Sequence, residues 1–88
     1  MSAVPDELLL YTRSGCPLCD EFAEALAAFL GDRPGLPTIR IVDVDGDPAA
    51  WLRWGVSVPV LVRGERVVCG GHFDGDRLLA GLADEGSG

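Results

Sequence analysis

The sequence contains no lysine, so its positive charge comes from arginine alone, and the arginines are scattered without forming a cluster. There are 7 basic residues against 14 acidic residues, which gives a formal net charge of -7 at pH 7. Binding to nucleic acid usually depends on a basic patch or stripe. We therefore expect no nucleic-acid partner, and an acidic surface that slows the approach of anionic molecules.

Long apolar runs and a secretory leader are also missing. No stretch reaches the roughly 20 apolar residues that a membrane-spanning helix needs, so no membrane partner is expected. The chain does not open with a charged segment, an apolar core and a small-residue cleavage site, and its cysteine count of 3 is odd. These features favour the reducing cytoplasm over a secreted disulfide framework. In that compartment a close cysteine pair is more often catalytic or metal-binding than a permanent crosslink.

The length of 88 residues and the hydrophobic content of 48% are sufficient for one small domain with a core of its own. No internal repeat or low-complexity segment interrupts the chain. We expect a single domain over residues 1–88, with residues 1–6 and 84–88 loose. A monomer is expected.

The pattern of apolar residues predicts strands at 8–12, 38–44, 60–63 and 66–69, helices at 17–30 and 48–54, and a last helix with Leu78, Leu79 and Leu82 on its apolar side. Gly64-Glu65 fits a tight hairpin, and Asp47 and Asp74 fit helix N-caps. A helical crossover makes the first two strands parallel, and the hairpin makes the last two antiparallel. The predicted fold is therefore α/β in βαβαββα order, with a four-stranded mixed sheet flanked by helices.

Cys16 and Cys19 stand where the first predicted strand gives way to the first predicted helix. The unpaired N–H groups and the positive dipole end of a helix start favour a thiolate, which is the form that attacks disulfides. Because Pro17 suits the first helical turn, Cys16 falls at the helix entrance as the exposed nucleophile, with Cys19 as its shielded partner. The acidic Asp20 and Glu21 oppose a thiolate there, so we expect the pKa of Cys16 to be only moderately low.

With its Cys-Pro-x-Cys at a strand-to-helix turn, the chain resembles small glutaredoxin-like proteins of the thioredoxin fold over nearly its whole length. Four stretches carry this resemblance: residues 11–19, the Ser-Val-Pro at 57–59, the Gly-Gly-His-Phe-Asp at 70–74, and the Asp-Val-Asp at 43–45 with the aspartate-proline helix start after it. The resemblance implies that the peptide bond before Pro59 is cis. It also implies a substrate or glutathione site made by Arg13, Leu18, Ser57, Val58, Pro59, Gly70, Gly71 and Asp74.

Some of these residues have roles that follow from their place in the site. A cis bond at Pro59 would leave the backbone of Val58 free to pair with a substrate chain. The charge of Arg13 could stabilise the Cys16 thiolate or bind a substrate carboxylate. The N–H groups of the Gly70-Gly71 turn, together with the start of the last helix, suit a carboxylate of glutathione. Leu18, however, stands where the family usually has tyrosine, which weakens the case for glutathione.

The combined reading is a thiol-disulfide oxidoreductase that reduces protein or glutathione mixed disulfides through the Cys16-Cys19 dithiol. Its expected partners are a disulfide-containing protein or small thiol substrate, and glutathione or a flavin thioredoxin reductase that reduces the pair again. No bound cofactor is expected, and glutathione is a candidate co-substrate.

Two other kinds of function remain open. The chain could be a non-enzymatic thioredoxin-fold binding or adaptor module, or a metal-binding protein in which the C-x-x-C is half of a zinc site. Only Cys69 and His72 are left as further zinc ligands, and we expect a buried thiol and a loop residue at these positions. The resemblance also disfavours an iron-sulfur carrier, because family members that hold such clusters usually lack a proline directly after the first cysteine, where this chain has Pro17. A calcium loop at 43–47 is rejected, because its glycine comes too early.

Overall fold

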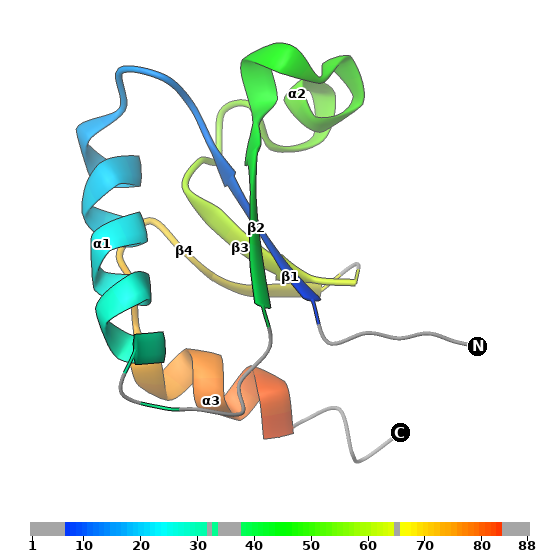
Figure 1. The fold of residues 1–88 in the computed structure, drawn as a ribbon. Coiled ribbons are helices and arrows are strands. Elements are labelled where there is room, and N and C mark those ends of the chain that lie inside the picture. The colour runs from blue at the N-terminus through cyan, green and yellow to red at the C-terminus, as the bar shows by residue number, and fades with distance from the viewer. Residues whose placement is uncertain (1–6, 32, 34–37, 65, 84–88) are drawn as a thin grey trace.

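The computed structural model describes residues 7–31, 33, 38–64 and 66–83, so the predicted loose ends and Glu65 of the hairpin lie outside the described residues. Along the chain it contains β1 (Glu7–Thr12), α1 (Pro17–Gly31), β2 (Thr38–Asp43), the 3-10 helix η1 (Val44–Gly46), α2 (Pro48–Trp54), β3 (Val60–Arg63), β4 (Arg66–Gly70) and α3 (Gly75–Ala83). Figure 1 shows the strands running through the centre of the molecule, with α1 beside them and α2 beyond the end of β2.

The four strands form one sheet in the order β2-β1-β3-β4. β1 is parallel to β2, in a register that pairs Leu10 with Ile41. β1 and β3 are antiparallel, and so are β3 and β4. The hairpin between β3 and β4 turns at Gly64, whose φ of 62° is readily adopted only by glycine. The structure thus confirms the predicted α/β class, the order of the elements and the mixed sheet.

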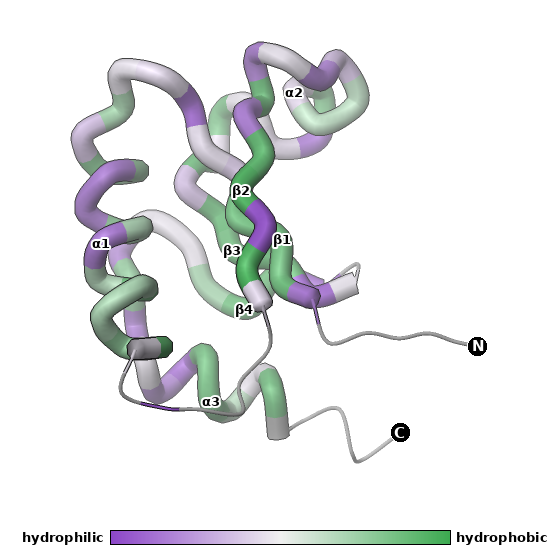
Figure 2. The backbone as a smooth tube through the Cα atoms, viewed as in Figure 1, coloured by the Kyte–Doolittle hydropathy of each residue, from purple (hydrophilic) through white to green (hydrophobic). Residues whose placement is uncertain are grey.

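One face of the sheet carries the hydrophobic core. Successive residues of a strand point to opposite faces, so Leu8 and Leu10 of β1 share a side. Both are fully buried in a cluster with Phe22 and Leu26 of α1 and Leu78 of α3. Figure 2 shows this arrangement as hydrophobic stretches along the central strands and alternating hydrophobic and hydrophilic residues along α1. The helical spacing of the apolar residues in α1 and α3 therefore fixes both helices on this face.

On the other face, α2 packs against the end of β1. Tyr11 points away from the Leu8 and Leu10 side, and its ring centroid lies 5.8 Å from that of Trp54 in α2. The side chain of Asp47 accepts hydrogen bonds from the N–H groups of Ala49 and Ala50, as the predicted N-cap requires. Trp54 thus packs against β1.

Three strand ends differ from the prediction by one residue: β1 begins at Glu7, β2 ends at Asp43 and β4 ends at Gly70, and the change at β2 has a local cause. Val44 was expected to close the second strand, but it begins η1. The cause is Asp43, whose Oδ1 accepts a hydrogen bond of 2.9 Å from the N–H of Asp45 and so caps the turn. Val44 is nevertheless fully buried, so its side chain serves the core from a turn instead of a strand.

Among the helices in the described part of the chain, none has the length and apolar character that crossing a membrane would require.

Candidate functional site

A disulfide joins Cys16 and Cys19 at the N-terminus of α1, with their Cα atoms 5.2 Å apart. Gly15 makes the turn into the helix with a φ of 75°. The N–H of Cys19 lies 3.1 Å from the sulfur of Cys16 and donates a hydrogen bond to it. Cys19 is only 2% exposed, whereas Cys16 is half-buried. The exposure of the two cysteines therefore follows the predicted order, with Cys16 the more accessible.

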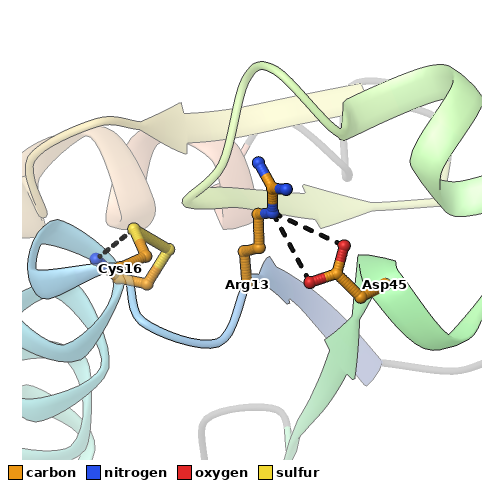
Figure 3. Close-up of a disulfide and its surroundings, with 4 residues drawn as sticks. Arg13, Cys16 and Asp45 are labelled. Carbon is orange, nitrogen blue, oxygen red and sulfur yellow. Dashed lines mark hydrogen bonds and ion pairs between the residues drawn. A yellow bond between two sulfur atoms is a disulfide. The ribbon is translucent and has the colours of Figure 1, made fainter.

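Arg13 lies in the loop before the cysteines, and its side chain is directed toward Asp45 (Figure 3). Its Nε is 3.4 Å from Oδ1 and 3.5 Å from Oδ2 of that carboxylate. The guanidinium carbon also lies 4.6 Å from the centre of the Trp51 ring, within the range of a cation–π contact. Sequence reasoning expected Arg13 to serve the thiolate or a substrate carboxylate, but the structure gives it a carboxylate partner from the protein itself.

A second acidic residue holds the same loop. The hydroxyl of Ser14 donates a hydrogen bond of 3.4 Å to Oδ2 of Asp43, at the end of β2. Asp43 and Asp45 thus join the turn after β2 to the loop that leads into Cys16. The sequence pointed to these residues only as a resemblance, through the Asp-Val-Asp stretch, and gave neither of them a role in the site.

An open cleft of about 440 Å³ lies beside Cys16. Its lining residues are Arg13, Ser14, Gly15, Cys16, Asp45, Gly55, Val56 and Val58. Of the residues expected in the site, it brings together Arg13, Cys16 and Val58. Ser57 is exposed outside this lining, and Pro59 is buried after a cis Val58-Pro59 peptide bond. Val56, which is 96% exposed, is a cleft residue that sequence reasoning missed.

A second cleft, of about 250 Å³, lies on another side of α1. It is lined by Leu18, Glu21, Phe22, Ala25, Gly71, His72 and Phe73. Leu18 and Gly71, both expected to bind a substrate, therefore share a cleft that does not include Cys16 or Arg13. The ring of Phe73, which the sequence did not single out, packs edge-on against Phe22 and Phe29, with centroid distances of 5.6 and 5.4 Å.

At the glycine turn, the N–H of Gly71 is not free as expected. Gly70 pairs with Val60 in the sheet, and the N–H of Gly71 donates a 2.9 Å hydrogen bond to the carbonyl of Pro59. The start of α3 is also occupied, because Oδ1 of Asp74 accepts from the N–H groups of Asp76 and Arg77. Asp74 is thus the predicted cap. The expectation that the Gly71 N–H is available to a glutathione carboxylate was wrong, since it is used to hold the turn against Pro59.

Cys69 lies outside both cleft linings. It is a free thiol on β4 and is buried, as expected of a small hydrophobic residue. Burial raises the pKa of the Cys69 thiol above its ordinary value, because desolvation penalises the thiolate. Over the residues that the structure describes, no group of three or more histidine, cysteine and acidic side chains is arranged to hold a metal ion.

A mixed four-stranded sheet with a cysteine pair at the turn from its central strand β1 into α1 defines a protein of the thioredoxin-like fold. The chain belongs to the glutaredoxin-like domain family (DUF836), which matches residues 7–83. No curated protein matches it.

Solved structures agree with this assignment. The X-ray structure of the structural genomics target protein XcR50 from X. campestris has 38% sequence identity and a TM-score of 0.66, and the match covers 88% of this chain and 96% of that one. The solution NMR structure of protein Ne2328 from Nitrosomonas europaea has 26% identity and a TM-score of 0.69, covering 91% and 94%. A structure described as that of a malarial protein shares the fold, at 17% identity and a TM-score of 0.59 over 90% and 93%. Family membership and the Cys16-Cys19 pair together point to a redox role.

Proposed function

We propose that this protein is a thiol-disulfide oxidoreductase that reduces protein or small-molecule mixed disulfides through the Cys16-Cys19 dithiol. One observation carries the proposal: the pair forms a disulfide at the N-terminus of α1, with Cys16 lining an open cleft and Cys19 buried behind it. A reducing compartment such as the cytoplasm suits this activity, because the dithiol is the form that reduces substrates.

The helix start supplies the reactivity of Cys16. The Cys19 N–H that now donates to the Cys16 sulfur can donate to the thiolate once the pair is reduced, and the positive end of the helix dipole acts in the same direction. Asp20 lies in the first turn of α1 and opposes this effect with its negative charge. The thiolate of Cys16 is therefore stabilised mainly by backbone groups.

The reaction is a thiol-disulfide exchange in two steps. The Cys16 thiolate attacks one sulfur of the substrate disulfide, forms a mixed disulfide and expels the other sulfur as a thiolate, which takes a proton from water. Cys19, after losing its proton, attacks the Cys16 sulfur and expels the second substrate thiol. The substrate gains two electrons and two protons, and the protein is left with the Cys16-Cys19 disulfide.

The backbone of Val58 is suited to hold an extended substrate. Within the described residues, neither its N–H nor its carbonyl has a backbone hydrogen-bond partner. Val58 also lines the cleft beside Cys16. An extended peptide that pairs with Val58 would therefore lie along the cleft, in the manner of an added strand.

The donor that reduces the disulfide again is either glutathione or a flavin thioredoxin reductase. For glutathione, the proposed contacts remain those of the family resemblance: Arg13, Leu18, Ser57, Val58, Pro59, Gly70, Gly71 and Asp74. Two contacts weigh against it, because the Arg13 guanidinium faces Asp45 and the Gly71 N–H is bonded to Pro59. The reductase is therefore the favoured donor.

A trapping experiment tests the proposed function. Reduced Cys19→Ser protein incubated with a disulfide-bearing peptide is expected to accumulate a mixed disulfide at Cys16, since the residue that resolves it is missing; mass spectrometry detects the adduct. Cys16→Ser should give none, and Cys69→Ser should behave like the unmodified protein, because Cys69 is buried outside the clefts. If reduced Cys19→Ser protein forms no adduct with peptide or glutathione disulfides, a non-enzymatic binding module becomes the better reading.

The electron donor is identified by a second measurement. The oxidised protein is mixed with glutathione, or with thioredoxin reductase and NADPH, and loss of the Cys16-Cys19 disulfide is followed by mass spectrometry. Faster reduction by the reductase is expected from the contacts of Arg13 and Gly71.

A further inference from the structure

The charge available to a substrate beside Cys16 is controlled by one ion pair. Among the described residues that line the two clefts, Arg13 is the only arginine, and its Nε faces both carboxylate oxygens of Asp45 at 3.4 and 3.5 Å. Asp45 lines the same cleft as Arg13. A substrate carboxylate that approaches Cys16 therefore meets an arginine whose charge is already balanced.

The position of Arg13 is held from a second direction by Trp51, whose ring lies 4.6 Å from the guanidinium carbon. Trp51 in turn packs closely on Gly55, where a Cβ atom would stand 2.5 Å from Cε3 of the indole. Only a residue without a Cβ allows this approach. Arg13 thus has an anionic partner and an aromatic partner from the segment that follows β2.

Among the described residues that line this cleft, no other side chain is cationic. Val56 contributes an almost fully exposed apolar side chain, and Glu21 adds a carboxylate to the neighbouring cleft. Glutathione carries carboxylates at both ends, and the one arginine among the lining residues is already paired through its Nε with Asp45, so its attraction for a further carboxylate is weakened. A disulfide with uncharged groups around its sulfurs does not depend on that attraction.

We propose that Asp45 is a specificity-determining residue, which holds Arg13 in the ion pair and thereby directs Cys16 to disulfides with uncharged flanking groups in preference to glutathione mixed disulfides. The inference rests on the proposed thiol-disulfide exchange. Asp45 itself takes no part in the chemistry, and its effect is exerted through Arg13.

The test compares two substrates whose small-molecule halves are charged in one case and neutral in the other, and it reads the ratio of their rates in each variant. One peptide with a single cysteine is prepared as a mixed disulfide with glutathione and, separately, with 2-mercaptoethanol, whose hydroxyethyl group is neutral. Each is mixed with excess reduced protein, and release of the peptide thiol is followed in a single turnover. The protein loses two electrons and two protons to form its disulfide, and the peptide and the small molecule leave as thiols, so no additional reductant is needed.

Asp45→Asn removes the charge that holds Arg13. The rate with the glutathione disulfide, relative to the hydroxyethyl disulfide, is expected to rise about fivefold, the size of effect that an exposed ion pair supports. Adding Arg13→Gln to Asp45→Asn should abolish the gain, and high salt should reduce it. Asp47→Asn is the matched control: it removes the same charge from the same segment, has no contact with Arg13, and retains a side-chain oxygen to cap α2.

The outcomes separate the inference from the proposed function. A fold disturbed by the substitution would change both rates together, whereas release of Arg13 changes their ratio. An unchanged ratio in Asp45→Asn, or an equal rise in Asp47→Asn, overturns the role of Asp45 while disulfide exchange stands. If the unmodified protein reduces neither substrate, the proposed function itself is wrong.

Discussion

The core side of the sheet, under α1 and α3, and the segment from α2 to Val58 are packed very differently. Under α1 and α3, side chains such as Leu26 and Leu78 are no more than 2% exposed, whereas on α2 and the turn after it Leu52 is 86% and Val56 is 96% exposed. Burial of apolar surface is the main source of stability in a small domain, so the α1 and α3 face supplies most of it. The segment from α2 to Val58 retains apolar and polar groups at the surface, next to Cys16. The buried core and the exposed groups beside Cys16 therefore lie in different parts of one small domain.

The strongest test of this comparison is to replace one leucine with alanine in the core under α1 and, separately, one exposed leucine on α2. Leu26→Ala is expected to lower the free energy of unfolding by about 2 to 5 kcal/mol, because it leaves a cavity in the core. Leu52→Ala should change it by no more than about 0.5 kcal/mol, since that side chain is already in water. Urea denaturation of the oxidised proteins measures both. Equal losses would show that α2 is as important to stability as α1.

One position on the α2 side is an exception to its open packing. A Cβ at Gly55 would meet Cε3 of Trp51 at 2.5 Å and its carbonyl oxygen at 2.6 Å. Gly55→Ala should therefore cost about 1 to 3 kcal/mol of unfolding free energy and change the tryptophan fluorescence, as Trp51 moves.

Gly46→Ala provides the control for this substitution, because a Cβ there meets nothing within 4 Å. It is expected to leave both the stability and the fluorescence almost unchanged. If Gly55→Ala behaved in the same way, the position of Trp51, and with it the support for Arg13, would not depend on this glycine.

The sequence was informative wherever the determinants are local. The helical spacing of Phe22 and Leu26, the aspartate caps at 47 and 74 and the glycine at the hairpin act over a few residues, so the element order and nearly all boundaries could be predicted. The Cys-Pro-x-Cys is equally local. The prediction that Val44 belongs to the second strand was wrong, because the side chain of Asp43 caps a turn that begins at Val44.

The site residues that escaped prediction depend on contacts between distant segments. Arg13 and Asp45 are 32 positions apart in the sequence, and nothing in a local pattern reveals which of the acidic residues an arginine meets. The engagement of the Gly71 N–H likewise depends on how β4 lies beside Pro59. Sequence reasoning therefore found the paired cysteines but not the groups that set the charge around them.

The core face also contains the buried free thiol of Cys69. Burial raises the pKa of Cys69 above its ordinary value of 9.0. The unfolded chain thus loses this proton first as the pH rises, so the stabilising contribution is complete below the unfolded pKa and is lost between the unfolded and the folded pKa. Unfolding of the oxidised protein should become easier above pH 9, and Cys69→Ala should show a shallower decline. Parallel pH profiles for the two proteins would contradict this assignment.

The smallest expected effect concerns the exposed apolar residues on the α2 side, where Val56 lines the cleft and Leu52 does not. Val56→Ser should lower kcat/KM for a peptide disulfide about twofold to threefold, the loss expected when part of one apolar contact disappears. Leu52→Ser makes a similar change to the surface outside the cleft and should have no effect on kcat/KM. Because both side chains are exposed, neither substitution should alter stability appreciably, so a difference in rate would come from contact with the substrate. Equal kcat/KM values for Val56→Ser and Leu52→Ser would mean that the exposed side chain of Val56 does not contact the substrate.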